Sequence, residues 1–132
     1  HASPYAKDIM FLDFVEQADL NALYSASDVF VFPSRNEGFG LPLVEAFASG
    51  TPVITSNVTA LPEVAGDAAI IVDPTDVSAL ADAMCRILSD TRFRDMLVQK
   101  GLVRAPVFTW IETARKTSDL YERLVSTPES VC

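Results

Sequence analysis

PSRNEGFGLPLVEAFASG, residues 33–50, places two closely spaced glycines ahead of a helical pattern. The apolar run Val-Phe-Val-Phe at 29–32 leads into it. Such a run, bounded by turn residues, predicts a buried strand. Gly38 and Gly40 allow the backbone to pass close to a ligand or to take positive φ. Residues 33–40 are therefore expected to form a glycine loop at the end of a strand.

A helix and a second strand are expected after this loop. Pro42 suits the first turn of a helix, and Gly50 suits the position just past the helix end. Residues 51–55 then read as a strand. Residues 38–41 would present backbone N–H groups at the helix N-terminus, where the helix dipole also favours anions. The stretch predicts a phosphate-binding unit of strand, glycine loop, helix and strand.

Two carboxylates frame the glycine loop. Glu37 lies in the loop, and Glu45 lies about one turn into the helix. The eight-residue step from Glu37 to Glu45 crosses the loop, so it is not a helical spacing. We interpret the pair as a cleft with one carboxylate on each side of the phosphate position. Carboxylates there would accept hydrogen bonds from sugar and ribose hydroxyls. Plainer interpretations stay open, because Gly38 and Gly40 also suit an ordinary strand-to-helix turn and either glutamate suits a solvated surface.

The rest of the chain alternates between strand and helix patterns. This alternation indicates an α/β fold with a parallel sheet. Asp19 and Asp90 are expected to cap helices, Gly101 to end one, and Thr109-x-x-Glu112 reads as a capping box. Further strands are expected at 9–12 and 69–72, helices at 19–27, 76–89, from 90 to Gly101 and from 109, a helical turn at 61–64, and a frayed tail at 126–132.

Composition limits the function classes. The chain has 132 residues, 49% of them apolar, which suits one domain with a real core. Its net charge of −8 argues against a nucleic-acid surface and against autonomous binding to an anionic membrane. No apolar run approaches the roughly 20 residues of a spanning helix, and residues 1–10 carry no visible signal peptide. A cytoplasmic location is therefore expected, with no transmembrane segment and no nucleic-acid partner.

Motifs for nucleophilic catalysis or metal binding are sparse. His1 is the only histidine, so no Ser-His-Asp or Cys-His arrangement can be built. No His/Cys/Asp cluster has metal-ligand spacing, and no metal site is expected. Cys85 and Cys132 do not make a disulfide framework. Cys85 falls in an apolar helical pattern, which predicts a packing role.

The stretch resembles the Glu-x7-Glu signature of retaining GT-B glycosyltransferases of the group 1, or family 4, type. The matching residues are Glu37-Gly38-Phe39-Gly40-Leu41-Pro42, then Glu45-Ala46, then Gly50-x-Pro52-Val53-Ile54. The resemblance extends over nearly the whole chain, through Leu61-Pro62-Glu63-Val64 and Asp73-Pro74 to Phe108-Thr109-Trp110.

The resemblance implies two Rossmann-like domains with the active site between them. Residues 1–125 would be part of the nucleotide-sugar-binding domain, and 126–132 a C-terminal tail. The donor substrate would be a nucleotide-diphosphate sugar, with no further cofactor. A sugar would pass to a glycan, lipid or small-molecule acceptor with retention of anomeric configuration, the main catalytic task being stabilisation of the leaving diphosphate.

Site residues carry over by position within the matched run. Glu37, the catalytic candidate, would contact donor-sugar hydroxyls, and Glu45 would hold the ribose hydroxyls. The donor-binding loop would comprise Gly38 together with the backbone amides of Phe39, Gly40 and Leu41, which would contact the sugar or the diphosphate. The nucleobase would lie near Phe14 and Val15.

The chain departs from the family in extent. The acceptor-binding domain is absent, and so is the basic Arg and Lys pair that neutralises the diphosphate. Lys7 is the only lysine or arginine in residues 1–28. The chain is therefore expected to be the last third of an enzyme, inactive alone and partnered by the missing N-terminal portion. That parent would be cytoplasmic or peripheral to the membrane.

Two other functions stay open. A net charge of −8 without the basic pair weakens diphosphate binding, and it motivates a non-catalytic interaction module with a degenerate sugar-nucleotide fold. A GT-B sugar-nucleotide epimerase would share the fold, but the run from Glu37 to Glu45 fits the transferases better.

The expected sheet has a gap. The family's strand order is 3-2-1-4-5-6, and by resemblance the strand at 9–12 is the third and that at 29–32 the fourth. The first and second strands would have stood between them. Unpaired backbone groups on apolar strands are costly and sticky. We expect either another chain, such as a second copy, to fill the gap, or the 9–12 strand to move beside 29–32, with self-association in either case.

Overall fold

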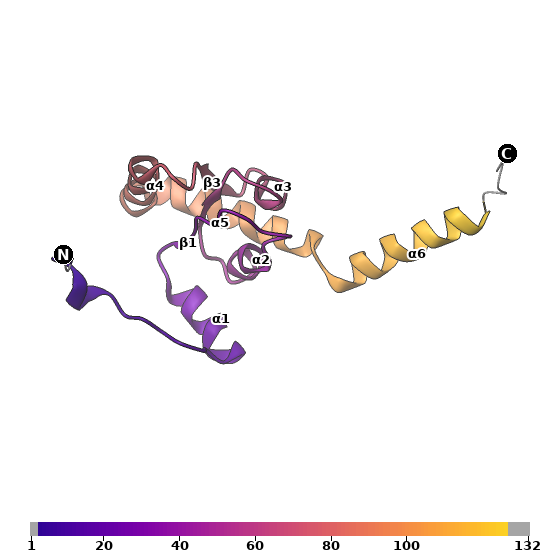
Figure 1. The fold of residues 1–132 in the computed structure, drawn as a ribbon, viewed down its shortest axis with the longest axis horizontal. Coiled ribbons are helices and arrows are strands. Elements are labelled where there is room, and N and C mark those ends of the chain that lie inside the picture. Colours follow the sequence, from indigo (N-terminus) through magenta and orange to yellow (C-terminus); the bar gives the residue numbers. More distant parts are fainter. Residues whose placement is uncertain (1–2, 127–132) are drawn as a thin grey trace.

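The structure, a computed structural model, describes residues 3–126 and has a small parallel sheet at its centre (Figure 1). The strands are β1 (Phe30–Phe32), β2 (Val53–Ser56) and β3 (Ala69–Val72). Their order in the sheet is β1-β2-β3, and both pairs are parallel. In the sheet register, Phe30 is paired with Val53, and Val53 is paired with Ala69. The predicted α/β class with a parallel sheet is confirmed.

Helices connect the strands and extend the chain beyond them. Most begin where the sequence predicts, and Asp76 and Asp90 each accept a hydrogen bond from the backbone N–H three residues on, at 2.9 and 3.0 Å. The helices are α1 (Gln17–Ala26), α2 (Leu41–Ala48), α3 (Leu61–Ala65), α4 (Val77–Ser89), α5 (Thr91–Arg104) and α6 (Trp110–Ser126), with 3-10 turns η1 (Ala6–Asp8) and η2 (Ala105–Val107).

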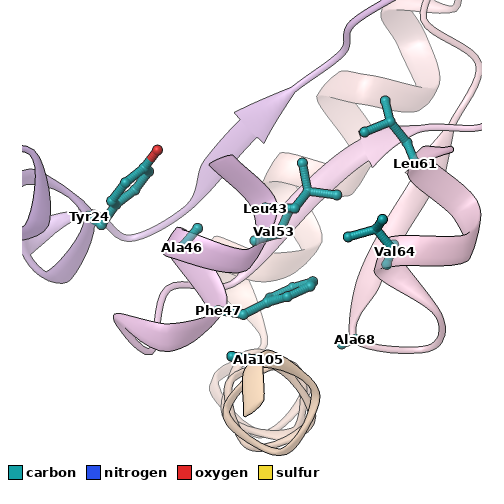
Figure 2. Packing of buried hydrophobic residues seen from close by; sticks show 10 residues of the cluster. Tyr24, Leu43, Ala46, Phe47, Val53, Leu61, Val64, Ala68 and Ala105 are labelled. Atoms are coloured by element: carbon teal, nitrogen blue, oxygen red, sulfur yellow. The ribbon is translucent and has the colours of Figure 1, made fainter. Parts of the chain in front are cut away.

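The middle strand divides the core into two clusters. All four residues of β2 are buried, and alternate side chains point to opposite faces of the sheet. Val53 joins a cluster with α1, α2 and α3, whereas Ile54 joins a second cluster with α4 and α5. Figure 2 shows Leu43 and Phe47 of α2 projecting toward the α3 side of the first cluster. Helices therefore cover both faces of the sheet, and α2 is held tightly on one of them.

Helix α6 projects away from this body (Figure 1). None of its described residues is buried, and its large apolar side chains are exposed: Trp110 is 81% and Leu124 66% accessible. Half of the expected capping box is formed at its start, because the backbone N–H of Glu112 donates to Thr109 Oγ1 at 3.1 Å, whereas within residues 3–126 the Glu112 carboxylate does not accept from the N–H of Thr109. Glu112 itself pairs with Arg115 at 2.8 Å.

The strand expected at 9–12 is not formed. Residues 9–15 have no helix or strand, and Phe11 is 91% exposed. Within the described residues β1 pairs only with β2, so the expected move of 9–12 to the side of β1 is wrong. A strand needs a partner for its backbone groups, and Figure 1 shows the N-terminal segment lying apart from the sheet. The other expectation, that a further chain fills this edge, stays a prediction.

Three smaller expectations are also wrong. Helix α1 begins at Gln17 with Glu16 as its N-cap, so Asp19 lies in the first turn and caps nothing. Gly101 does not end α5, which continues to Arg104. Cys85 is exposed, because its position on α4 faces away from the buried side formed by Ala83 and Ile87. The predicted tail lies, apart from residue 126, outside the described residues. Within residues 3–126 no helix is both long and apolar enough to cross a membrane.

Candidate functional site

The glycine loop ends at Gly40, which is the N-cap of α2. Gly40 has φ 96° and ψ 49°, the left-handed conformation that favours glycine. A Cβ at this position would lie 2.6 Å from Leu61 Cδ2, so internal packing also requires glycine here. Gly38 differs, because a Cβ there would meet no described atom within 4 Å. Of the two glycines, Gly40 is fixed by the fold, and Gly38 leaves space in front of the loop.

The N-terminus of α2 lies directly after the loop. Pro42 is in the first turn, as predicted, and lacks an N–H. Among residues 3–126 no side chain caps this end of the helix. The N–H of Leu43 donates to the carbonyl of Gly40 at 3.0 Å. Within the described residues the amides of residues 38–41 have no hydrogen-bond partner, and free amides at a helix N-terminus attract an anion. The backbone geometry at residues 38–41 is compatible with the predicted anion position, which stays a prediction.

Glu37 is half-buried and anchored within the loop. Ser34 Oγ donates a hydrogen bond to Glu37 Oε1 at 3.1 Å. The backbone N–H of Glu37 donates to Thr59 Oγ1 at 3.2 Å, which ties the loop to the segment between β2 and α3. Thr59 has φ 53°, unusual for a residue other than glycine. Ser56 Oγ donates to the carbonyl of Ser34 and fastens the loop to the end of β2. The Ser34 contact restrains the Glu37 carboxylate, and the other two contacts fix the backbone of the loop.

Glu45 lies on α2 and is half-buried. Tyr24, in the last turns of α1, donates from Oη to Glu45 Oε2 at 3.3 Å. Burial of Tyr24, together with the negative charge of Glu45 and their hydrogen bond, raises the pKa of Tyr24 to about 12. The phenol is therefore protonated at neutral pH and remains a donor to the carboxylate.

Phe39 and Leu41 face a hollow of about 480 Å³ between the loop and the start of α6. The ring of Phe39 packs edge-on against Phe108, with ring centroids 5.5 Å apart. Both Phe39 and Leu41 are exposed, at 39% and 54%. Their side chains thus line an apolar hollow, while their backbone lies at the start of α2.

The structure brings most of the predicted site residues together. Glu37, the loop residues 38–41 and Glu45 all lie at or next to the start of α2. Phe14 and Val15 lie in the irregular segment before α1 and belong to neither core cluster; Phe14 is 85% exposed. The described residues contain no group of three or more His, Cys, Asp or Glu side chains that could hold a metal ion.

The hydroxyl side chains that contact the two glutamates and their loop are not among the site residues predicted from the sequence. Two of them could have been found from the sequence. Ser34 and Ser56 lie at the carboxyl ends of two predicted strands, and the carboxyl ends of neighbouring parallel strands meet at one edge of a sheet. Tyr24 carried no such signal, since it reads as one more apolar position of a helix. Its contact with Glu45 depends on how α1 packs against α2.

The chain is similar in sequence to known proteins. Residues 2–104 match the family described as group 1 glycosyl transferases. O-antigen chain mannosyltransferase B of Escherichia coli is 43% identical over 116 residues, which are 88% of this chain and 30% of that protein. D-inositol 3-phosphate glycosyltransferase of Corynebacterium glutamicum (strain R) is 38% identical over 122 residues, 91% of this chain and 29% of that protein.

A solved structure agrees with these relatives. Sucrose-phosphate synthase from Thermosynechococcus elongatus superposes with a TM-score of 0.81 at 36% identity, covering 92% of this chain and 31% of that one. The chain thus spans about a third or less of the proteins it resembles. Since the family match covers well over half of its residues, the chain belongs to the group 1 glycosyl transferases, and its α/β unit matches a GT-B glycosyltransferase domain.

Proposed function

We propose that this chain is the nucleotide-sugar donor-binding part of a retaining glycosyltransferase. One observation carries the proposal: Glu37 lies in the glycine loop just before the uncapped N-terminus of α2, and Glu45 lies about one turn into that helix. Backbone N–H groups suit a diphosphate, and carboxylates suit the hydroxyls of the sugars joined to it. One short helix end thus offers matching partners for each part of a nucleotide-diphosphate sugar.

Each group has a distinct task in this proposal. Glu45 accepts hydrogen bonds from the ribose hydroxyls, and Glu37 accepts them from the donor sugar. The amides of residues 39–41 stabilise the negative charge that grows on the leaving diphosphate, which is the main catalytic contribution. Phe14 and Val15 are proposed to lie beside the nucleobase. No metal and no cofactor other than the donor is invoked.

The rest of the activity is proposed to reside in a longer protein. The chain covers 30% of its E. coli relative, and α6 and the segment at 9–14 leave large apolar side chains exposed. These features support residues 1–125 as part of one domain, completed by a further portion that binds the acceptor. That portion would also supply cations against the diphosphate, since this chain carries a net charge of −8. The isolated chain would then be inactive, and the whole protein cytoplasmic or peripheral to a membrane.

The donor sugar is proposed to be a hexose such as mannose. Several of the relatives, at 36 to 43% identity, are named as mannosyltransferases. The acceptor, whether glycan, lipid or small molecule, would be chosen by the other domain.

A non-catalytic interaction module is the second candidate. The net charge of −8 favours it, because an acidic chain attracts a diphosphate less well. Such a module would keep the fold and the packing of Gly40 but would need neither carboxylate.

Calorimetric titration of the longer protein with a panel of nucleotide-diphosphate sugars, beginning with GDP-mannose, tests the proposal. We expect one donor to bind, with Glu37→Gln and Glu45→Gln each weakening binding or turnover about tenfold or more. Asp82→Asn, which removes an exposed carboxylate on α4, is the matched control and should change neither. Donor binding and turnover that survive both glutamine variants would contradict the proposal and favour the interaction module.

A further inference from the structure

Tyr24 contacts the carboxylate of Glu45, the residue proposed to bind the ribose. It is the one buried aromatic residue of α1, at 6% exposure, and it contacts the carboxylate of α2 through its hydroxyl. The ring packs edge-on against Phe30 of β1, with ring centroids 5.1 Å apart. Its backbone carbonyl accepts a hydrogen bond from Thr51 Oγ1 at 2.6 Å. Ring and backbone therefore fix where the hydroxyl points, independently of Glu45.

Only one oxygen of Glu45 is engaged by Tyr24. Oη donates to Oε2 at 3.3 Å, and within residues 3–126 no donor contacts Oε1. Each carboxylate oxygen has two lone pairs, so a carboxylate that accepts one bond can accept several more. A diol such as a ribose 2′,3′ pair needs two acceptor positions at a fixed orientation. A carboxylate whose rotation is restrained by a donor on one oxygen meets that need.

We propose that Tyr24 is a positioning residue that orients the Glu45 carboxylate for the hydroxyls of the donor nucleotide. The inference rests on the proposed function, since it presumes that Glu45 binds the donor. Tyr24 itself does not touch the donor: its hydroxyl is directed at Glu45 and its ring lies in the core. The phenol is a better positioning group than a lysine here, because it donates a single bond without neutralising the carboxylate.

Tyr24→Phe in the longer protein isolates the hydroxyl, because the ring, with its contact to Phe30, is retained. With GDP-mannose, or whichever donor of the panel is turned over, we expect the donor KM to rise about 3- to 10-fold with kcat within about twofold. Tyr121→Phe is the matched control, since Tyr121 is 63% exposed on α6, and it should leave both constants unchanged.

A double-mutant cycle separates positioning from a general structural role. If Tyr24 acts only through Glu45, Tyr24→Phe should add nothing to the KM of Glu45→Gln. An added effect of full size in that background would overturn the proposal, as would a wild-type KM for Tyr24→Phe while Glu45→Gln raises it. In both of those cases the proposed role of Glu45 stands. If Glu45→Gln leaves both kcat and the donor KM unchanged, the proposed role of Glu45 fails and the inference fails with it, whereas the proposed function fails only if Glu37→Gln also has no effect. Circular dichroism spectra of each variant monitor folding, and Tyr24→Met replaces Tyr24→Phe if the latter unfolds, because methionine adapts to irregular core space and likewise has no hydroxyl.

Discussion

Gly101 packs directly against the ring of Phe47: a Cβ at position 101 would lie 2.9 Å from Phe47 Cδ1. Gly101 is in the interior of α5, and Phe47 is a fully buried residue of α2. A glycine inside a helix costs about 1 kcal/mol relative to alanine. Here that cost is offset by the close approach of α5 to α2, the helix that carries the proposed donor site.

Gly101→Ala should therefore destabilise the protein, although alanine is the better helix former. Overpacking of a buried ring costs about 1–3 kcal/mol, more than the gain in helix propensity. Urea denaturation followed by circular dichroism measures the change. Phe47→Leu, which shortens the opposing side chain, serves as the background for the control. In that background Gly101→Ala should cost less, and equal costs in both backgrounds would show that the Phe47 contact is not responsible.

Gly40 and Gly38 should respond differently to alanine. Gly40→Ala places a side chain at φ 96° and against Leu61, so we expect a loss of about 1–3 kcal/mol in the free energy of unfolding. Gly38→Ala meets nothing in the described structure and should leave stability within about 0.5 kcal/mol. If a ligand approaches the backbone there, Gly38→Ala should still weaken donor binding. Thermal unfolding of both variants measures stability, and calorimetry measures their donor binding. Normal donor binding by Gly38→Ala would show that the loop serves only as a turn between strand and helix.

Gly38 and Gly40 also show which features can be predicted from the sequence and which cannot. The strand, loop and helix around residues 33–50 are local patterns, and these elements form as predicted. The sequence suggested that Gly40 leaves room for a ligand, yet the structure gives Leu61, twenty-one residues away, as its close neighbour. Contacts of that kind depend on the packing of α2 against α3, which no local pattern records.

The error at residues 9–12 has a different physical cause. An apolar run has strand propensity, but a strand forms only where neighbouring backbone groups are available. Within the described residues none is supplied to this run, and Phe11 remains exposed. The error at Gly101 has the same cause as that at Gly40, a packing contact with a residue far away in the sequence. Glycine commonly ends a helix, but Gly101 continues α5 because the helix passes close to Phe47.

Arg104 joins the end of α5 to the end of α3. Its Nε donates to the carbonyl of Val64 at 3.0 Å, and a terminal nitrogen donates to the carbonyl of Glu63. A cation that satisfies the last carbonyls of a helix is stabilising. Arg104→Ala should lower the free energy of unfolding by about 1–3 kcal/mol. Arg104→Lys should recover only part of this, because an ammonium lacks the planar fork. Arg92→Ala, exposed on the same helix, is the control in chemical denaturation, and an equal loss there would contradict the capping role.

Alkaline titration tests the state of Tyr24. The pKa of Tyr24 rises from 10.0 to about 12 on folding, because the phenol is buried and donates to the Glu45 carboxylate. A raised folded-state pKa means that the protonated phenol contributes stability in full below pH 10 and loses that contribution as the pH rises toward 12. Tyr24→Phe cannot ionise at this position. The difference in free energy of unfolding between the wild type and Tyr24→Phe should therefore shift against the wild type between pH 10 and pH 12, while absorbance at high pH follows phenolate formation. A difference that stays constant across this interval would show that Tyr24 ionises equally in the folded and unfolded protein, and that Glu45 does not hold its proton.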